Sequence, residues 1–377
     1  SEFDYKIKYW NPQQQYLDIK NEIDDAIKRV LESGDYILSK EVEDFERGFA
    51  GYVGTKYAVG LNSGTDALFL ALRAIGVRGG DEVITTSNTF IATIATIAHC
   101  GAKPVLVDVD KDGLIDLSEV EKSITSRTKA IVPVHLEGKI CDMSWLRSIA
   151  NDSDFGKLFI VEDAAQAIGA SPKSYSLKAG AWGDIGCFSF YPAKILGVPG
   201  DAGAITTNDK TIYEEIKQLR DHYNIGKVPE NDKTKYGFNS RLDSIHAAIL
   251  NVKLGHLERY LNHRKRIAGT YTENLKDLPL VLPSNQEGRV WQEYVLQVPA
   301  RRDELARYLD ERGVKVRGHN LIPNHLYKNL NFNMNLPETE KYYSQALRLP
   351  MSSETQDWEV EYVCDEIKQF YDEKSTL

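Results

Sequence analysis

Cysteine is scarce in this chain of 377 residues, and its four cysteines are scattered (Cys100, Cys141, Cys187 and Cys364). None forms a Cys-x-x-Cys pair, and none stands at ligand spacing from a histidine. Disulfide frameworks and structural metal sites both need such clustering. We therefore expect no metal site, buried free thiols and a reducing, cytoplasmic setting.

Long apolar runs and an excess of basic charge are also missing. No run of eighteen apolar residues occurs and no secretory signal pattern opens the chain, so we expect no membrane association. The formal net charge is −9, which weighs against nucleic-acid binding. No Gly-x-Gly-x-x-Gly motif follows the first expected strand, which argues against a nicotinamide-dependent oxidoreductase.

The order of the apolar segments predicts an α/β protein. Short β-rich runs alternate with helical patterns, as in parallel βαβ units. The expected strands are 57–61, 82–86, 104–108, 129–135, 158–162, 185–190 and 203–207, and the expected helices include 65–75, 90–99 and 242–260. The polar stretch 227–235 is expected to be a loop.

The pattern changes near residue 255. A strand at 294–298, a helix at 302–312 and a short run at 314–316 indicate a smaller α+β unit. We therefore expect a large domain over 10–255, with a mostly parallel mixed sheet flanked by helices. A small C-terminal domain is expected over 256–377.

Lys194 lies in an unusual setting. The segment 187–204 around it is apolar and rich in glycine, and Pro192 stands two residues before it. A lone lysine is most often exposed to solvent. The proline and glycines around Lys194 instead favour an apolar loop with a fixed conformation. A desolvated lysine has a lowered pKa and can form Schiff bases.

Asp163 closes the apolar run that begins at Phe159. A buried carboxylate needs a cationic or hydrogen-bonding partner. A protonated ring nitrogen of a ligand would serve, and so would the N-terminus of the following segment, so both interpretations stay open. Gln166 lies one helical turn further along and could reach the same ligand.

The segment Asn62-Ser-Gly-Thr-Asp66 joins an expected strand to an expected helix. A helix N-terminus attracts anions, Gly64 allows close approach, and Thr65 offers a hydroxyl to a phosphate. Simple capping of the helix by Ser63 or Thr65 is the competing interpretation. Ser189 is a weaker candidate for a second phosphate ligand.

Phe90 follows a strand and a polar turn. It could stack on a cofactor ring, although a core position is the commoner role for phenylalanine. A phosphate cradle, a ring carboxylate and a lysine, in this order along a βαβ chain, are the anchors that pyridoxal 5'-phosphate (PLP) needs. The combination predicts a PLP site.

These motifs resemble those of a known family. Asn-Ser-Gly-Thr-Asp-Ala, Val-Glu-Asp-Ala-Ala-Gln, Phe-Ser-Phe-Tyr-Pro-x-Lys with Gly-Asp-x-Gly-Ala, and Gly237-Phe-Asn-Ser-Arg-Leu-Asp243 resemble the DegT/DnrJ/EryC1/StrS sugar aminotransferases. The resemblance extends from about residue 10 to 370. It implies a PLP enzyme of fold type I, the aspartate-aminotransferase-like fold.

The resemblance also implies a role for each site residue. Lys194 would form the Schiff base with PLP, Asp163 would bind the pyridine nitrogen, and Gln166 would lie near the ring hydroxyl. Phe90 would stack on the ring. The remaining implied ligands bind phosphate: Gly64, Thr65 and Ser189 in one subunit, and Asn239 reaching into the other. A homodimer with shared active sites is therefore expected.

Within that family, Phe-Tyr-Pro before the lysine and Gly-Asp-Ala-Gly after it are most similar to enzymes that aminate C-3 of a dTDP-linked 3-keto-6-deoxyhexose. L-Glutamate would be the amino donor, and a nucleotide-linked keto sugar would be the acceptor. Amination at C-4 and a non-catalytic PLP-binding regulator are the alternatives. A same-fold dehydratase would carry histidine in place of Lys194.

The sequence departs from the family pattern at three places. Ile195 stands where asparagine is usual, Glu137 and Lys139 stand where tyrosine and glutamine are usual, and Gln292-Glu293 stands where a histidine is often found. The last two departures are expected to alter contacts with the sugar or the nucleotide. They leave the PLP anchors unchanged.

Overall fold

A computed structural model of the chain describes residues 4–172, 176–224 and 236–372. The loop expected at 227–235 lies outside these residues. Within the described residues, seven strands form one sheet in the order β1-β7-β6-β5-β4-β2-β3. They are β1 Tyr57–Leu61, β2 Glu82–Thr86, β3 Lys103–Val107, β4 Thr128–Ile131, β5 Phe159–Asp163, β6 Ile185–Ser189 and β7 Gly203–Thr207.

The sheet is mixed but mostly parallel, as expected. Strand β7 runs antiparallel to both of its neighbours, β1 and β6, whereas the other neighbouring pairs are parallel. Because parallel strands need crossover helices, both faces of such a sheet become covered. The buried, β-branched composition of β2 and β5 agrees with that covering.

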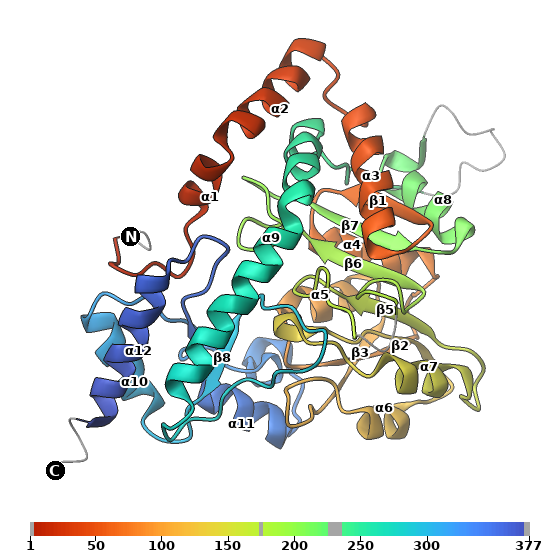
Figure 1. Cartoon of the computed structure of the whole chain (residues 1–377). Helices are drawn as coiled ribbons and strands as arrows, with labels where there is room; N and C mark the ends of the chain where they lie inside the picture. The colour runs from red at the N-terminus through yellow and green to blue at the C-terminus, as the bar shows by residue number, and fades with distance from the viewer. Residues whose placement is uncertain (1–3, 173–175, 225–235, 373–377) are drawn as a thin grey trace.

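Helices surround the sheet (Figure 1). In the first part of the chain they are α1 Pro12–Asp18, α2 Lys20–Ser33, α3 Lys40–Val53, α4 Gly64–Ala74, α5 Ile91–His99, α6 Leu117–Ser123, α7 Met143–Asn151 and α8 Lys210–Leu219. Short 3-10 turns occur at Leu136–Gly138 and His222–Asn224. Helix α4 begins one residue earlier than expected, because Ser63 provides its N-cap.

The long helix α9 (Ser244–Leu275) runs across the molecule and links the sheet region to the C-terminal elements (Figure 1). These elements are β8 Tyr294–Gln297, α10 Arg302–Glu311, 3-10 turns Asn324–Leu326 and Lys328–Leu330, α11 Pro337–Gln345, β9 Ala346–Leu349 and α12 Asp357–Asp372. Strands β8 and β9 form an antiparallel pair. Helix α9 continues without a break through residue 255, and the domain boundary there stays a prediction.

The other expected strands agree with the structure to within one residue, but the segments at 129–135 and 314–316 differ more. Strand β4 ends at Ile131 rather than at residue 135, because Pro133 has no N–H to donate to a ladder. Beyond it, pairing is reduced to a single bridge between Val134 and Asp163. The short run at 314–316 makes only an isolated bridge from Val314 to Ile7, so it is not a strand.

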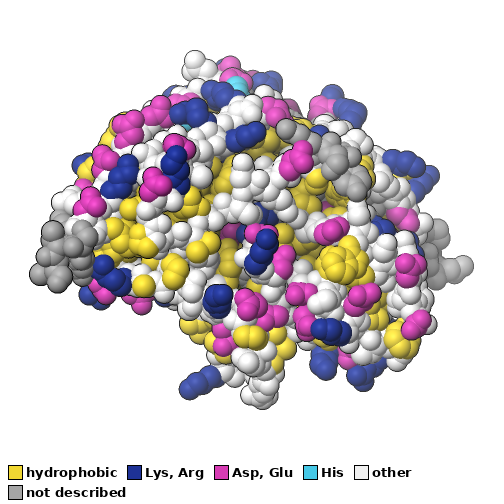
Figure 2. Space-filling model, turned by 60° about the horizontal axis from the view of Figure 1, so that its bottom comes forward, with side chains coloured by type: hydrophobic (Ala, Val, Ile, Leu, Met, Phe, Trp, Pro, Cys, Tyr) yellow, Lys and Arg dark blue, Asp and Glu magenta, His cyan; other side chains and the backbone are white. Residues whose placement is uncertain are grey.

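Charged side chains of both signs are interspersed on the face shown in Figure 2, with hydrophobic patches between them. The net negative charge therefore does not gather on this face. Within the described ranges, no helix is both long and apolar enough to cross a membrane. The same residues contain no group of three or more histidine, cysteine or acidic side chains arranged to hold a metal ion.

Candidate active site

Lys194 lies in the tight loop that follows β6. Its N–H donates to Tyr191 O at 2.9 Å, and Val198 N–H donates to Phe190 O at 2.9 Å, which closes the loop on itself. The next residues, Ile195 and Leu196, are buried. Burial lowers the pKa of the Lys194 amine from its usual value, although Glu293 and Asp163 oppose the shift. At this amine the effect of burial is thus larger than that of the nearby carboxylates.

Gln292 fixes this loop through hydrogen bonds to its main chain. Its Oε1 accepts from Ile195 N–H at 3.2 Å, and its Nε2 donates to Ala193 O at 3.0 Å. Both peptide groups flank Lys194. The side chain of Gln292 is itself buried, so the clamp is shielded from competition with water.

Asp163 is buried at the carboxyl end of β5, where the sequence placed it. Its Oδ2 accepts from the Thr93 hydroxyl at 2.8 Å, and its Oδ1 accepts from Ala165 N–H at 3.2 Å. Thr93 also contacts the Thr89 hydroxyl at 2.6 Å. A carboxylate held by a hydroxyl and one main-chain N–H retains capacity for a further donor.

The N-terminus of α4 meets the end of β6. Ser63 caps the helix, with its Oγ accepting from Asp66 N–H at 3.0 Å, so the capping interpretation is confirmed for Ser63. Thr65 is exposed and remains available. A Cβ built on Gly64 would lie 2.6 Å from the Ser189 Cβ, so only glycine allows this approach. Gly64 and Ser189 are therefore in contact, as a shared phosphate site requires.

A cavity of about 490 Å³ opens beside Lys194. Phe90 and Gln166 line it with the lysine. Phe90 is 74% exposed, so the core position considered for it is wrong. Loop residues from the C-terminal part, among them Leu321, Ile322, Asn324, Tyr327, Asn329 and Leu330, complete the wall.

Asn239 is exposed, and its neighbour Ser240 contacts Asn62, in the segment proposed as the phosphate cradle. The Ser240 hydroxyl donates to Asn62 Oδ1 at 3.1 Å, and Asn62 N–H donates to Ser240 Oγ at 3.4 Å. The segment that carries Asn239 is thus fixed beside the cradle of its own chain. Reach into a second subunit stays a prediction.

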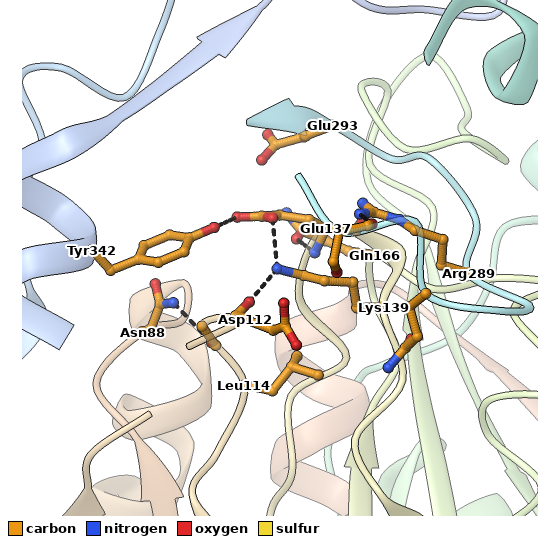
Figure 3. Close-up of polar contacts among 12 residues, drawn as sticks. Asn88, Asp112, Leu114, Glu137, Lys139, Gln166, Arg289, Glu293 and Tyr342 are labelled. Atoms are coloured by element: carbon orange, nitrogen blue, oxygen red, sulfur yellow. Dashed lines mark hydrogen bonds and ion pairs between the residues drawn. The ribbon is translucent and has the colours of Figure 1, made fainter. Parts of the chain in front are cut away.

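A buried polar network surrounds Glu137, which contacts Gln166 (Figure 3). Glu137 Oε2 is 3.0 Å from Lys139 Nζ, and Glu137 Oε1 accepts a hydrogen bond from Tyr342. Burial alone would raise the pKa of Glu137, but Lys139 and Tyr342 hold it below its usual value. Glu137 N–H donates to Gln166 Oε1 at 2.7 Å, so the amide nitrogen of Gln166 is free to face the cavity.

The other unusual pair, Gln292-Glu293, also lies at the site. Glu293 lines the cavity, and its Oε2 is 3.0 Å from Arg348 Nε. Burial lowers the pKa of Arg289, which donates to Glu137 O at 3.0 Å, to about 10. Among the residues that depart from the family pattern, Glu293 is the one that lines the described cavity.

Sequence reasoning missed Thr93, Tyr342 and Arg348. Arg348 interrupts the apolar strand Ala346–Leu349, which is a usable signal for a buried charge with a function. Thr93 and Tyr342 have no comparable signal, because their partners lie 70 and 205 residues away in the sequence.

The profile of the DegT/DnrJ/EryC1/StrS aminotransferase family matches residues 17–368. The chain belongs to this family. Its relatives include a "pleiotropic regulatory protein" of Geobacillus stearothermophilus, 40% identical, covering 95% of this chain and 96% of the relative. A dTDP-3-amino-3,4,6-trideoxy-alpha-D-glucose transaminase of Streptomyces venezuelae is 39% identical, over 97% and 96%.

A dTDP-3-amino-3,6-dideoxy-alpha-D-galactopyranose transaminase of Aneurinibacillus thermoaerophilus is 41% identical, over 97% of this chain and 99% of the relative. Among solved structures, S. venezuelae DesV matches with a TM-score of 0.90 at 38% identity, covering 97% and 98% of the two chains. NtdA of Bacillus subtilis, solved with bound cofactor PMP, has a TM-score of 0.86 at 30% identity, over 93% and 82%. These matches confirm the expected family and the type I fold.

Proposed function

We propose that this aminotransferase uses PLP to move an amino group from L-glutamate to C-3 of a dTDP-3-keto-6-deoxyhexose. The observation that carries the proposal is a desolvated Lys194 in one cavity with Phe90 and Gln166, in a chain about 40% identical to two dTDP-3-amino-sugar transaminases over nearly its full length. The motif Phe190-Tyr-Pro192 supports the same position on the sugar.

The residues present fit PLP. The contact that only glycine at position 64 permits brings the Ser189 hydroxyl to the first turn of α4, where unpaired N–H groups favour a phosphate. Asp163 has spare acceptor capacity for a protonated ring nitrogen. When bound, PLP supplies an electrophilic carbonyl and an electron-withdrawing ring.

Lys194 is proposed as the catalytic base and nucleophile. Its lowered pKa increases the share of neutral amine near neutral pH, which is the form that attacks a carbonyl and accepts a proton. Lys194 Nζ would remove the proton from the donor Cα as a general base and give it up again as a general acid. The Gln292 clamp holds the main chain of this loop while the side chain moves.

The other residues bind and orient. Asp163 would hold the ring nitrogen in its protonated state, and Thr93 fixes the orientation of that carboxylate. Phe90 would cover one ring face, and Gln166 would donate its amide N–H toward the ring oxygen. Thr65, with Gly64 and Ser189, would bind the phosphate. We also propose a cytoplasmic homodimer in which Asn239 contributes to the partner's phosphate site.

The experiment is a panel of dTDP- and UDP-linked 3-keto and 4-keto sugars with L-glutamate, analysed by mass spectrometry. We expect the dTDP-3-keto-6-deoxyhexose to gain an amino group with the highest kcat/KM. A higher kcat/KM for dTDP-4-keto-6-deoxyglucose would show that C-4 is the true position. No conversion of any sugar, together with no spectral change of the bound cofactor on adding glutamate, would favour the regulator suggested by the name of the Geobacillus relative.

A further inference from the structure

Glu137 has an unusual main-chain conformation for a residue other than glycine. Its φ is 60° and its ψ is 12°, which places it in the left-handed region within the turn Leu136–Gly138. This region is unfavourable for a residue with a long side chain, and it persists only where the surrounding contacts hold it. Such conformations are concentrated at sites that bind a ligand or react. The contacts that hold Glu137 therefore point to a function for this turn.

The side chain of Glu137 is held by two partners (Figure 3). Its Oε2 lies 3.0 Å from Lys139 Nζ, and its Oε1 accepts a hydrogen bond from the Tyr342 hydroxyl. Lys139 also donates to Asp112 O. Glu137 and Lys139 are only 1% and 4% exposed. Removing one member of a buried pair leaves the other charge without compensation, so this pair holds the turn more firmly than an exposed ion pair would.

The main chain of the same turn is fixed by the segment before β8. Arg289 Nη2 donates to Glu137 O at 3.0 Å, and Val290 N–H donates to Gly138 O at 3.0 Å. A Cβ built on Gly138 would lie 2.0 Å from Val290 O, so the two segments approach as closely as glycine permits. Three separate parts of the chain, at 139, at 289–290 and at 342, thus converge on one turn.

The turn presents one N–H to a residue that lines the cavity. Glu137 N–H donates to Gln166 Oε1 at 2.7 Å. Leu136 and Gln166 are among the described residues that line the cavity beside Lys194, whereas Glu137 is not. A main-chain N–H can only donate, so it selects the oxygen of the Gln166 amide and leaves the nitrogen as the end that faces away. The angle between this N–H and the Glu137 side chain is set by φ, so the side-chain anchors also direct the N–H.

We propose that Glu137 is a positioning residue: anchored by Lys139 and Tyr342, it fixes Gln166 with its amide nitrogen toward the ring oxygen of bound PLP. The inference rests on the proposed function, because the role of Gln166 toward the ring oxygen comes from there. A donor held at this oxygen favours its negatively charged form. Since Tyr342 lies on α11, the same contacts connect the C-terminal part of the chain to the cofactor ring.

The test measures the affinity of the cofactor-free protein for PLP by fluorescence titration. Glu137→Gln should weaken PLP binding by about 3- to 10-fold, because Lys139 loses its counter-ion and one oriented hydrogen bond to the ring is lost. Gln166→Ala should cause a loss of similar size. The double variant should bind PLP no more weakly than Gln166→Ala alone, because Glu137 acts through Gln166. The pH at which the visible band of bound PLP changes should move in the same direction in both single variants.

Glu82→Gln is the matched control. Glu82 is also buried, and its carboxylate pairs with Arg127 at 2.8 Å and accepts from the Thr125 hydroxyl at 2.8 Å. It opens β2, whereas Asp163 closes β5, so Glu82 lies at the opposite end of the parallel strands. Glu82→Gln should lower the midpoint of urea unfolding, as Glu137→Gln does. It should leave the PLP affinity within about twofold, as a distant and independent site does.

Losses of PLP affinity that add up in the double variant would overturn the positioning role, and so would an equal loss in Glu82→Gln. If Glu137→Gln does not fold, Tyr342→Phe takes its place, because it removes one hydroxyl and keeps the ring. An unchanged PLP affinity in Tyr342→Phe would then overturn the role. Wild-type protein that binds PLP but converts no keto sugar would disprove the proposed function and leave the result for Glu137 intact.

Discussion

Gln292 holds the loop of Lys194 through both of its neighbouring peptide groups, at 3.2 Å to Ile195 N and 3.0 Å to Ala193 O. Gln292 is one of the departures from the family pattern, and Ile195, whose N–H it accepts, is another. Ile195 is fully buried and offers only its backbone N–H to the clamp. The amide side chain thus fixes the lysine without touching its amine.

Gln292→Leu should lower kcat by about 10- to 100-fold, because a small displacement of the reacting amine is costly. The unsatisfied peptide groups should also reduce the free energy of unfolding by about 1–3 kcal/mol. Gln286→Leu is the control, since Gln286 clamps Ile140 in the same two-bond manner, at 2.8 Å for each bond. Steady-state kinetics and urea unfolding of both variants separate the effects. If Gln286→Leu lowers kcat as much as Gln292→Leu does, the Gln292 clamp acts only through stability.

Thr93→Val should weaken cofactor binding and lower kcat by about tenfold, because the Asp163 carboxylate loses the hydroxyl that orients it. Valine keeps nearly the same volume. Thr96→Val is the control, because Thr96 lies three residues further along α5 and its hydroxyl donates to the main-chain carbonyls of Ala92 and Thr93. Cofactor dissociation is measured by fluorescence. A Thr96→Val effect as large as that of Thr93→Val would contradict a specific role for Thr93.

The strands and the anchors of the cofactor were within reach of sequence reasoning. Strands 57–61, 82–86 and 203–207 are confirmed at their predicted bounds, because apolar runs bounded by polar turns define them locally. Lys194 and Asp163 each carry a local signal, a polar group in an apolar segment. The Thr93–Asp163 and Gln292–Ile195 contacts join residues 70 and 97 positions apart, so no local pattern reports them.

The pH dependence of stability should reveal the buried Lys194 in cofactor-free protein. Burial lowers its pKa below the ordinary value of 10.5, so between these two values the unfolded chain binds more protons than the folded chain. Stability therefore rises with pH through that window. Below the lowered pKa the full cost of the buried ammonium remains.

Lys194→Met should accordingly stabilise the cofactor-free protein near neutral pH, and the gain should shrink as the pH rises toward 10.5. Urea unfolding between pH 7 and 10 measures the difference. The exposed Lys28, paired to Glu32 at 3.7 Å, provides a control. Lys28→Met should change stability by less than about 0.5 kcal/mol throughout. If the increase in the free energy of unfolding caused by Lys194→Met does not vary with pH, it comes from the methionine side chain and not from removal of the charge.

Hybrid dimers distinguish two placements of Asn239. The Ser240–Asn62 hydrogen bonds fix its segment beside the cradle of its own chain, whereas the family resemblance implies reach into the partner. We expect Lys194→Ala and Asn239→Ala each to be inactive as homodimers. If Asn239 serves the partner's site, a hybrid of the two variants carries one site with both lesions and one with neither. A purified hybrid should then recover about half of the wild-type activity, as C2 symmetry with shared sites requires. If Asn239 serves its own chain, both sites of the hybrid stay damaged and no activity returns.

The hybrid is prepared from differently tagged subunits that are refolded together and purified by two affinity steps. Sedimentation confirms its dimeric state. A fully active monomer would rule out shared sites altogether.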